Sequence, residues 1–249
     1  MRLLHYNELD STNLEARRVW PTHQPEPVAV RASTQTSGMG RNGRTWHSPM
    51  GGMWVTVAWP LSQPMPYYQA LPLVVGLALT KALEENFGNK LALQIKWPND
   101  VLLHGKKVAG ILCQSDTALN PPAILIGVGL NGDFHIQELN PNLRYPATTL
   151  RHELGDKVYF NMNTLTEQFL ATLGVYLRQF EETGFQPFAA ALQERLAWRG
   201  QIVRGTHGAD QPLEGILQGV DAYGRLLIQQ GHDVITLSSG ELDSLRPPQ

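Results

Sequence analysis

Residues 36–46 read TSGMGRNGRTW, a glycine- and arginine-rich segment without any periodic pattern of apolar residues. Its three glycines permit backbone conformations and close approaches that other residues forbid. Arg41 and Arg44 carry planar, permanently charged groups that suit carboxylates and phosphates. Residues 33–52 share this composition and predict a loop of about twenty residues, a length that is usually functional or disordered. The segment therefore predicts an anion-binding loop, with an incidental surface loop as the alternative.

The charge around this loop is locally positive although the chain as a whole is not. Between Glu26 and Glu84 the sequence has four basic residues and no acidic one, whereas the 249-residue chain has a net charge of −2. Gly38, Gly40 and Gly43 formally satisfy G-x-G-x-x-G, but the dinucleotide motif needs a helix directly after it and an acid about 20 positions on. A Walker A lysine–hydroxyl pair is also missing. We therefore exclude a dinucleotide-binding fold and a P-loop enzyme.

Apolar periodicity on both sides of the loop predicts the other elements. Two capping boxes, Thr12 with Glu15 and Thr164 with Glu167, mark helix starts. Helices are expected at 12–19, 71–87, 164–180 and 187–197. Strands are expected at 28–32, 53–59, 93–97, 108–114 and 124–130.

The pattern changes after Trp198 to short strands separated by glycine-rich turns, which predicts a small β-barrel. These strands are expected at 201–204, 213–220, 225–229 and 233–237. The chain then divides into a domain over residues 1–195 and a smaller one over 196–249. The smaller domain has a charge of −2, from four arginines against six acids, so a nucleic-acid-binding module is a weak alternative.

Composition limits the compartment and the chemistry. A single cysteine, Cys113, forbids an internal disulfide and fits a reducing compartment. No apolar run approaches 18 residues, and the N-terminal residues lack a signal-peptide pattern, so we expect a cytoplasmic protein with no membrane partner. The eight histidines show no metal-binding spacing and no C-x-x-C occurs, so no dedicated metal site is expected.

A second motif, KWPND at residues 96–100, follows a predicted strand, and Lys106 and Lys107 begin the next one. A hairpin would bring Asp100 close to Lys107, at a strand end where polar groups meet ligands; a solvated turn is the alternative. In the strand at 124–130, Gly127 and Gly129 fall on one face and would let a ligand or another backbone approach closely.

Five motifs thus occur in one order across about 120 residues. They are Ser11–Asn13, Gly38–Trp46 followed by Ser48 and Pro49, Lys96–Asp100, Lys107 with Ala109–Leu112, and Gly127–Asn131. In order and spacing they resemble the biotin–protein ligases, here biotin–[acetyl-CoA-carboxylase] ligases. The resemblance implies an α+β fold: a class II aminoacyl-tRNA synthetase-like catalytic domain with a mixed β-sheet and flanking helices, plus a small SH3-like β-barrel C-terminal domain. Some larger members carry an N-terminal winged helix; because the first motif begins at residue 11, we expect a short form without that DNA-binding domain.

The family reaction implies the partners and cofactors. Biotin and ATP give biotinyl-5′-AMP, and a lysine of a biotin carboxyl carrier domain of acetyl-CoA carboxylase then attacks the mixed anhydride. Two anions must be brought together, so electrostatic preorganisation is the expected main catalytic contribution. Mg²⁺ would arrive with the ATP phosphates, and no metal ligands are named.

The resemblance also assigns residues. Lys107 and Arg41 are implied as catalytic. Biotin would contact Ser11, Thr12, Asn13, Gln35, Gly40, Arg41, Asn42, Lys107 and Gly110. The nucleotide would contact Arg41, Arg44, Trp46, Asn99, Asp100 and Asn131, with adenine stacked on Trp46; Trp46 as core packing and Thr12 as a mere helix cap are the alternatives.

One position departs from the family pattern: Met39 stands where the loop usually carries an arginine, which leaves one positive charge fewer beside the adenylate. The nearest rival enzyme is a lipoate or octanoate ligase on the same scaffold, and the acid that supports ATP–pyrophosphate exchange would separate the two. The resemblance also allows a homodimer.

Overall fold

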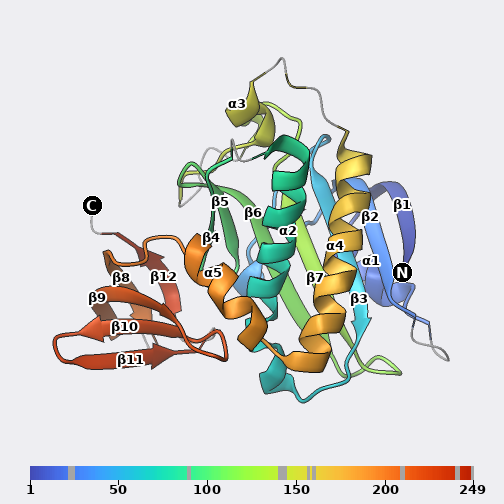
Figure 1. Ribbon diagram of the computed structural model, residues 1–249. Coiled ribbons are helices and arrows are strands. Elements are labelled where there is room, and N and C mark those ends of the chain that lie inside the picture. The colour runs from blue at the N-terminus through green and yellow to red at the C-terminus, as the bar shows by residue number, and fades with distance from the viewer. Residues whose placement is uncertain are drawn as a thin grey trace.

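A mixed β-sheet forms the centre of the larger part of the molecule (Figure 1). The computed structural model describes residues 1–21, 26–88, 91–139, 145–155, 158, 161–207, 211–238 and 242–247. Within them the sheet has seven strands in the order β1-β2-β3-β7-β6-β5-β4; β1 and β2 are parallel, and the other neighbours are antiparallel. They are β1 (Arg2–Leu9), β2 (Val28–Gln35), β3 (Met53–Pro60), β4 (Leu93–Lys96), β5 (Asp100–Leu103), β6 (Lys106–Asp116) and β7 (Ala123–Leu130).

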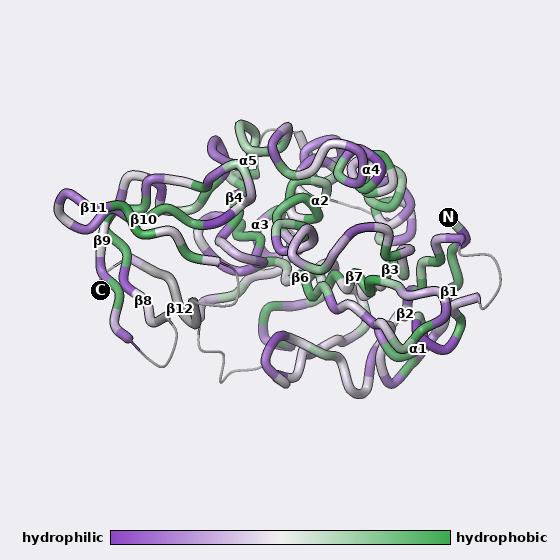
Figure 2. The backbone as a smooth tube through the Cα atoms, turned by 90° about the horizontal axis from the view of Figure 1, so that it is seen from below, coloured by the Kyte–Doolittle hydropathy of each residue, from purple (hydrophilic) through white to green (hydrophobic). Residues whose placement is uncertain are grey.

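Helices cover the two faces of this sheet unequally. Helices α2 (Leu71–Phe87) and α4 (Met162–Thr183) lie on one face, and the short α1 (Thr12–Arg18) lies on the other (Figure 2). Successive side chains of a strand point to opposite faces. Ile126 and Val128 of β7 therefore join the apolar core under α2 and α4, whereas Gly127 faces α1. α1 has only seven residues and covers this face only in part.

Both predicted capping boxes are wrong. The N-cap of α1 is Ser11, whose hydroxyl accepts a hydrogen bond from the backbone N–H of Asn13. The N-cap of α4 is Asn161 rather than Thr164. In each helix a good capping oxygen lies just upstream of the predicted one and satisfies a free N–H group there.

The sequence patterns also miss one helix and three strands, namely β1, β5 and a C-terminal strand at Leu242–Arg246. β1 lies at the sheet edge and is mostly exposed, so it lacks clean alternation, and β5 has only four residues. The short α3 (Leu150–Leu154) was not expected either. β2 continues to Gln35, so the predicted loop begins three residues later than residue 33.

The C-terminal part is a separate, smaller antiparallel sheet, consistent with the expected SH3-like barrel. After α5 (Ala189–Arg195), the described residues form five strands in the order β11-β10-β9-β8-β12. They are β8 (Ile202–His207), β9 (Gln211–Val220), β10 (Leu226–Gln230), β11 (Asp233–Leu237) and β12 (Leu242–Arg246). The α+β class with a mixed sheet and a small second domain is thus confirmed.

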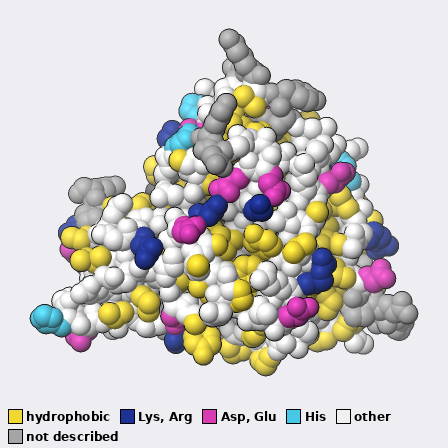
Figure 3. All heavy atoms as spheres, viewed as in Figure 1, with side chains coloured by type: hydrophobic (Ala, Val, Ile, Leu, Met, Phe, Trp, Pro, Cys, Tyr) yellow, Lys and Arg dark blue, Asp and Glu magenta, His cyan; other side chains and the backbone are white. Residues whose placement is uncertain are grey.

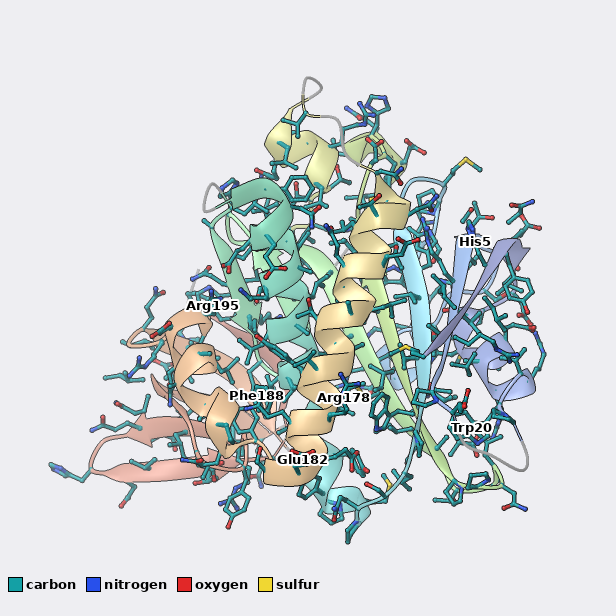
Figure 4. All side chains as sticks on the ribbon, turned by 45° about the vertical axis from the view of Figure 1, so that its right-hand side comes forward. His5, Trp20, Arg178, Glu182, Phe188 and Arg195 are labelled. Carbon is teal, nitrogen blue, oxygen red and sulfur yellow. The ribbon has the colours of Figure 1, made fainter. Side chains whose placement is uncertain are left out.

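The two parts share contacts as well as a chain. The buried indole N–H of Trp97, just after β4, donates to the backbone oxygen of Gly224 at 3.0 Å. Arg195 of α5, labelled in Figure 4, pairs with Glu84 of α2 at 2.9 Å. Leu213 and Leu217 of β9 belong to the same continuous apolar core as α2. The small sheet is therefore packed against the larger part of the molecule.

The face formed by α2, α4 and α5 shows basic and acidic side chains interspersed among apolar ones (Figure 3). It carries no broad patch of one charge within the described residues, which gives no support to a nucleic-acid-binding surface on this side. Among the helices of the described part of the chain, none is long and apolar enough to cross a membrane.

Candidate active site

A cleft lies on the α1 side of the sheet, beneath the glycine- and arginine-rich loop. The cavity within it has a volume of about 50 Å³. Residues from five places in the sequence line it: Thr12, Asn13, Gln35, Met39, Gly40, Arg41, Trp46, Asn99, Lys107, Gly110, Ile111, Leu112, Gly127, Val128 and Gly129. Nine of the residues assigned from the sequence thus meet in one cleft.

The floor of the cleft is made of glycine. Gly110 of β6 and Gly129 of β7 are paired across the two strands, and the indole of Trp46 lies on both. A Cβ on Gly129 would stand 2.5 Å from the indole nitrogen, and one on Gly110 would stand 2.7 Å from the ring. A Cβ on Gly127 would stand 2.6 Å from Oδ1 of Asn13. The predicted close approach at Gly127 and Gly129 is confirmed, and the approaching groups are side chains of the site itself.

The loop above this floor folds back on itself as a narrow hairpin. The backbone N–H of Gly40 donates to Arg44 at 2.7 Å, and that of Trp46 donates to Gly38 at 2.8 Å. Its tip, Arg41–Gly43, is a 3₁₀ turn in which Asn42 and Gly43 have positive φ angles of 56° and 70°. Asparagine and glycine tolerate that conformation best. The tip aims Arg41 inward.

Arg41 and Lys107 supply the positive charge of the cleft. Nη1 of Arg41 donates to Oδ1 of Asn99 at 3.2 Å. The Lys107 ammonium lies 2.6 Å from the Asp100 carboxylate and 5.0 Å from the centre of the Trp46 ring. The predicted hairpin that joins Asp100 to Lys107 is therefore confirmed. With the Lys107 side chain 26% exposed, its charge remains accessible from the cleft.

The opposite end of the cleft is polar and neutral. The side-chain oxygen Oε1 of Gln35 accepts from the backbone N–H of Thr12 at 2.8 Å, and Nε2 of Gln35 donates to Ser48 at 2.8 Å. Nδ2 of Asn13 donates to Gln114 at 3.1 Å. Hydroxyl and amide groups are thus held there by one another, as recognition of a neutral polar ring requires.

Other residues assigned from the sequence lie beside the cleft. Ser11 is buried as the cap of α1, and Asp100 is the partner of Lys107. Arg44 is exposed directly after the tip of the loop and does not line the cleft. Asn131 is buried; its Nδ2 donates to the backbone oxygen of Thr148 at 3.0 Å, and its Oδ1 has no partner among the described residues.

A second hollow runs along the outer edge of β6. This strand has 11 residues and β5 only four, so no described strand pairs with the outer edge of residues 112–116. The hollow shares Arg41 and Asn99 with the cleft and extends past Tyr68 and Ser115. Asn42 lines this hollow rather than the cleft. Cys113 lies at its wall, where burial raises the pKa of the thiol, so it is a packing residue rather than a nucleophile.

Three polar residues that are bonded to residues of the cleft escaped the sequence analysis: Thr56, Gln114 and Thr148. Thr56 is the polar residue on the α1-facing side of β3, opposite Val55 and Val57, and that alternation could have indicated it. Gln114 shares the face of Gly110 on β6. Thr148 bonds to the backbone of Lys107 from a segment without any sequence pattern, so no signal pointed to it.

A carboxylate outside the cleft supports the strand that carries Lys107. Glu153 of α3 accepts hydrogen bonds from His104 at 2.8 Å, from Lys106 at 3.3 Å and from Thr148 at 2.6 Å. Burial opposes the charged form, but these bonds prevail and hold the pKa of Glu153 at about 2. Within the described residues, no three His, Cys, Asp or Glu side chains gather where they could hold a metal ion.

The structure thus has a mixed sheet with a cationic cleft on its glycine face, followed by a small antiparallel sheet. Residues 7–131 match the model of the Biotin/lipoate A/B protein ligase family, and residues 200–243 match that of the Biotin protein ligase C terminal domain. The chain therefore belongs to the Biotin/lipoate A/B protein ligase family and carries the C-terminal domain of its biotin branch.

Relatives agree with this assignment. The chain is 34% identical, over 88% of its length and 91% of the relative's, to the biotin–[acetyl-CoA-carboxylase] ligase of Paracoccus denitrificans. It is 27% identical, over 97% of its length and 73% of the relative's, to the bifunctional ligase/repressor BirA of Bacillus subtilis. The biotin protein ligase of Aquifex aeolicus, solved in complex with biotin and ATP, superposes with a TM-score of 0.82 at 28% identity over 99% of each chain. The predicted enzyme class is confirmed.

Proposed function

We propose that the chain activates biotin with ATP and transfers it to a lysine of a biotin carboxyl carrier domain. The biotin carboxylate attacks the α-phosphorus of ATP; an anhydride bond forms and pyrophosphate leaves. The acceptor amine then attacks the carbonyl carbon of biotinyl-5′-AMP, and AMP leaves. The observation that carries the proposal is one cleft with two cations, Lys107 and Arg41, toward one end and neutral amide and hydroxyl groups at the other.

Lys107 and Arg41 are proposed as the catalytic residues. Each step concentrates negative charge between carboxylate and phosphate, and preorganised cations lower the energy of that arrangement. Asp100, 2.6 Å from the Lys107 ammonium, orients it. The Arg41 guanidinium, on a loop that glycines allow to move, would close over the adenylate.

The remaining contacts divide between the two ligands. The biotin ring would lie among side chains at the neutral end, with loop and strand backbone completing the site: Ser11, Thr12, Asn13, Gln35, Gly40, Asn42 and Gly110. The nucleotide would contact Arg44, Asn99, Asp100 and Asn131, with adenine against the Trp46 ring. Magnesium would enter with the ATP phosphates and keep most of its waters. The candidate oxygen ligands from the protein are Oδ1 of Asn131 and the Asp100 carboxylate.

The hollow along β6 is proposed as the entrance for the carrier domain. Its edge at residues 112–116 offers backbone N–H and C=O groups to an extended segment, the mode of recognition called strand addition. Because the hollow meets the cleft at Arg41 and Asn99, a lysine on such a segment reaches the anhydride. A second copy of the chain could pair with the same edge, so a homodimer would compete with the acceptor.

The wider setting is proposed from the sequence. A chain with one thiol and a net charge of −2 fits the cytoplasm and needs neither DNA nor a membrane as partner. The domain boundary is proposed near residue 195, at the end of α5, with the smaller domain over residues 196–249.

The test is incubation with ATP, magnesium and biotin, followed by mass-spectrometric detection of biotinyl-5′-AMP. We expect biotin, and neither lipoate nor octanoate, to support ATP–pyrophosphate exchange, because a dithiolane or an alkyl chain leaves the amides of the neutral end unpaired. Addition of a carrier domain should then add one biotin to one lysine. Failure of exchange with biotin would end the proposal, and exchange with lipoate instead would move the chain to the rival activity.

A further inference from the structure

Thr56 of β3 lies directly behind the neutral end of the cleft. It is fully buried and lines neither cavity, so it does not touch a ligand. Its Oγ1 donates a hydrogen bond to Oδ1 of Asn13 at 2.6 Å and lies 2.8 Å from Oγ1 of Thr12. It is therefore bonded to two residues that line the cleft.

The hydrogen bonds around Thr56 run in one direction because a hydroxyl has a single proton. Oδ1 of Asn13 can only accept, so the proton of Thr56 is committed to it. The contact between the two threonine hydroxyls must then use the proton of Thr12. Oε1 of Gln35 lies 3.0 Å from the same hydroxyl; without that proton it keeps the bond from the backbone N–H of Thr12 at 2.8 Å and has a second lone pair left.

This order decides what the cleft presents to a ligand. Thr12 has given its proton away, so its oxygen offers lone pairs, as does Oε1 of Gln35. The Asn13 amide uses one N–H on Gln114 at 3.1 Å, and its second N–H has no acceptor among the described residues. The neutral end therefore offers two acceptor atoms and one donor. A cyclic urea is the complement, since it has two N–H donors and one C=O acceptor.

We propose that Thr56 is a positioning residue that sets this order and thereby makes the cleft select a cyclic urea. A hydroxyl can accept from Thr12 and donate to Asn13 at the same time; a methyl group of similar size can do neither. Without it, the Thr12 proton returns to Gln35 and the Asn13 amide is released to turn over. The inference rests on the proposed activation of biotin.

The test compares Thr56→Val, Thr56→Ala and Thr56→Ser in ATP–pyrophosphate exchange with biotin and with 2-iminobiotin. At neutral pH the latter is a guanidinium, with N–H donors in place of the urea oxygen. We expect Val and Ala to raise the KM for biotin about tenfold, with kcat within about threefold of wild type. The preference for biotin over 2-iminobiotin in kcat/KM should fall about tenfold in both. Ser should keep the wild-type preference, and the KM for ATP should not change.

The paired variants separate polarity from packing. Val fills the space of Thr56, whereas Ala leaves a void. If packing matters, the two variants should differ in their preference for biotin; if polarity matters, both should lose it. The inference is overturned if both keep the wild-type preference, if only Ala loses it, or if Ser loses it too. If the Val and Ala variants both melt below the assay temperature, wild type and the Ser variant decide. Equal use of biotin and 2-iminobiotin by wild type overturns the inference. A strong preference for biotin in wild type and in the Ser variant supports it. If wild type forms no adenylate from biotin, the proposed function fails; an active wild type with unchanged ratios refutes only the role of Thr56.

Discussion

The two faces of strands β6 and β7 share one backbone but have different roles, because one face packs in the core and the other forms the site. Toward α2 and α4 they present Ile111, Ile126 and Val128, all buried in the apolar core. Toward α1 they present Gly110, Gly127 and Gly129, on which lie Trp46 and Asn13. One face gains stability by filling space with side chains. The other face has no side chains at its glycines and so leaves room for the residues of the site. Its buried hydrogen bonds and the packed opposite face must offset the stability that is lost there.

The largest expected effect is on the site face. Lys107→Ala removes a charge used as carboxylate and phosphate meet, and should cost about 3 kcal/mol in adenylate formation, by analogy with loss of one oxyanion donor. The neighbouring Lys106→Ala is the matched control, because Lys106 bonds to Glu153 outside the cleft. Single-turnover formation of biotinyl-5′-AMP measures both. A Lys107→Ala rate within about threefold of wild type would show that this lysine is not catalytic.

The next effect is on the core face. Ile126→Ala leaves a void in a fully buried position and should lower the free energy of unfolding by about 3 kcal/mol. The KM for biotin of the folded enzyme should stay near wild type, because the site face is untouched. Denaturant unfolding together with activity checks both parts. A raised KM at unchanged stability would mean that the faces are not separate in the way described.

Gly129→Ala should have the opposite effect: weaker ligand binding at nearly unchanged stability. Its Cβ would meet the Trp46 indole, which must shift, at a cost of about 2 kcal/mol in binding of the adenylate. Stability should change little, because the loop that carries Trp46 lies over the sheet rather than within it. Gly174→Ala in α4 is the matched control, because neither glycine has a positive φ and a Cβ on Gly174 would meet nothing closer than 3.6 Å. Thermal melts and titration with biotinyl-5′-AMP measure the two quantities.

The loop allows a smaller change. Arg41→Gly should form the adenylate but release it about tenfold faster, and the escaping anhydride would label bystander lysines. Met39→Arg should act in the opposite sense by adding the family's usual charge, more strongly at low salt than at high salt. Dissociation rates of biotinyl-5′-AMP at two ionic strengths decide. If all three proteins share one rate, the loop does not retain the intermediate.

The smallest effect concerns acid stability. The folded pKa of Glu153, about 2, lies below its ordinary value of 4.5, so the stability it contributes is present above pH 4.5 and is lost as the pH falls toward 2. We expect Glu153→Gln to lower the free energy of unfolding by about 1–2 kcal/mol at pH 7, since its partners His104 and Lys106 are partly exposed. The variant should also lose stability less steeply between pH 4.5 and 2. Identical pH profiles for wild type and variant would count against this role.

Sequence predicts one of these faces better than the other. Apolar periodicity identifies β3, β6, β7 and α2 because burial on a core repeats with the geometry of the element. The glycine floor, the loop and the Asp100–Lys107 hairpin can also be predicted. Glycine and turn residues indicate unusual backbone conformations, and arginine indicates local positive charge. The edge strand β1 does not, because exposure erases its alternation.

What the sequence could not supply is pairing between distant segments. Thr56 and Asn13 are 43 positions apart, and only the folded sheet makes them partners. Likewise Thr148 reaches Lys107 from a segment with neither periodicity nor motif. Ser11 was assigned to biotin contact, yet its visible role is to cap α1. Residues that position other residues through long-range hydrogen bonds leave no local sequence pattern, so the sequence alone does not reveal them.

The bond from the Trp97 indole to Gly224 has an evolutionary consequence. Trp97 belongs to the KWPND segment of the active site, and its buried N–H finds its acceptor only in a turn of the small sheet. A Cβ on Gly224 would approach Ala70 to 2.7 Å, so that turn must also stay narrow. A recombination event that exchanged the last fifty or so residues for a foreign barrel would leave an indole without an acceptor in the catalytic part. The two domains are therefore expected to be inherited together, and to change together, as one heritable unit.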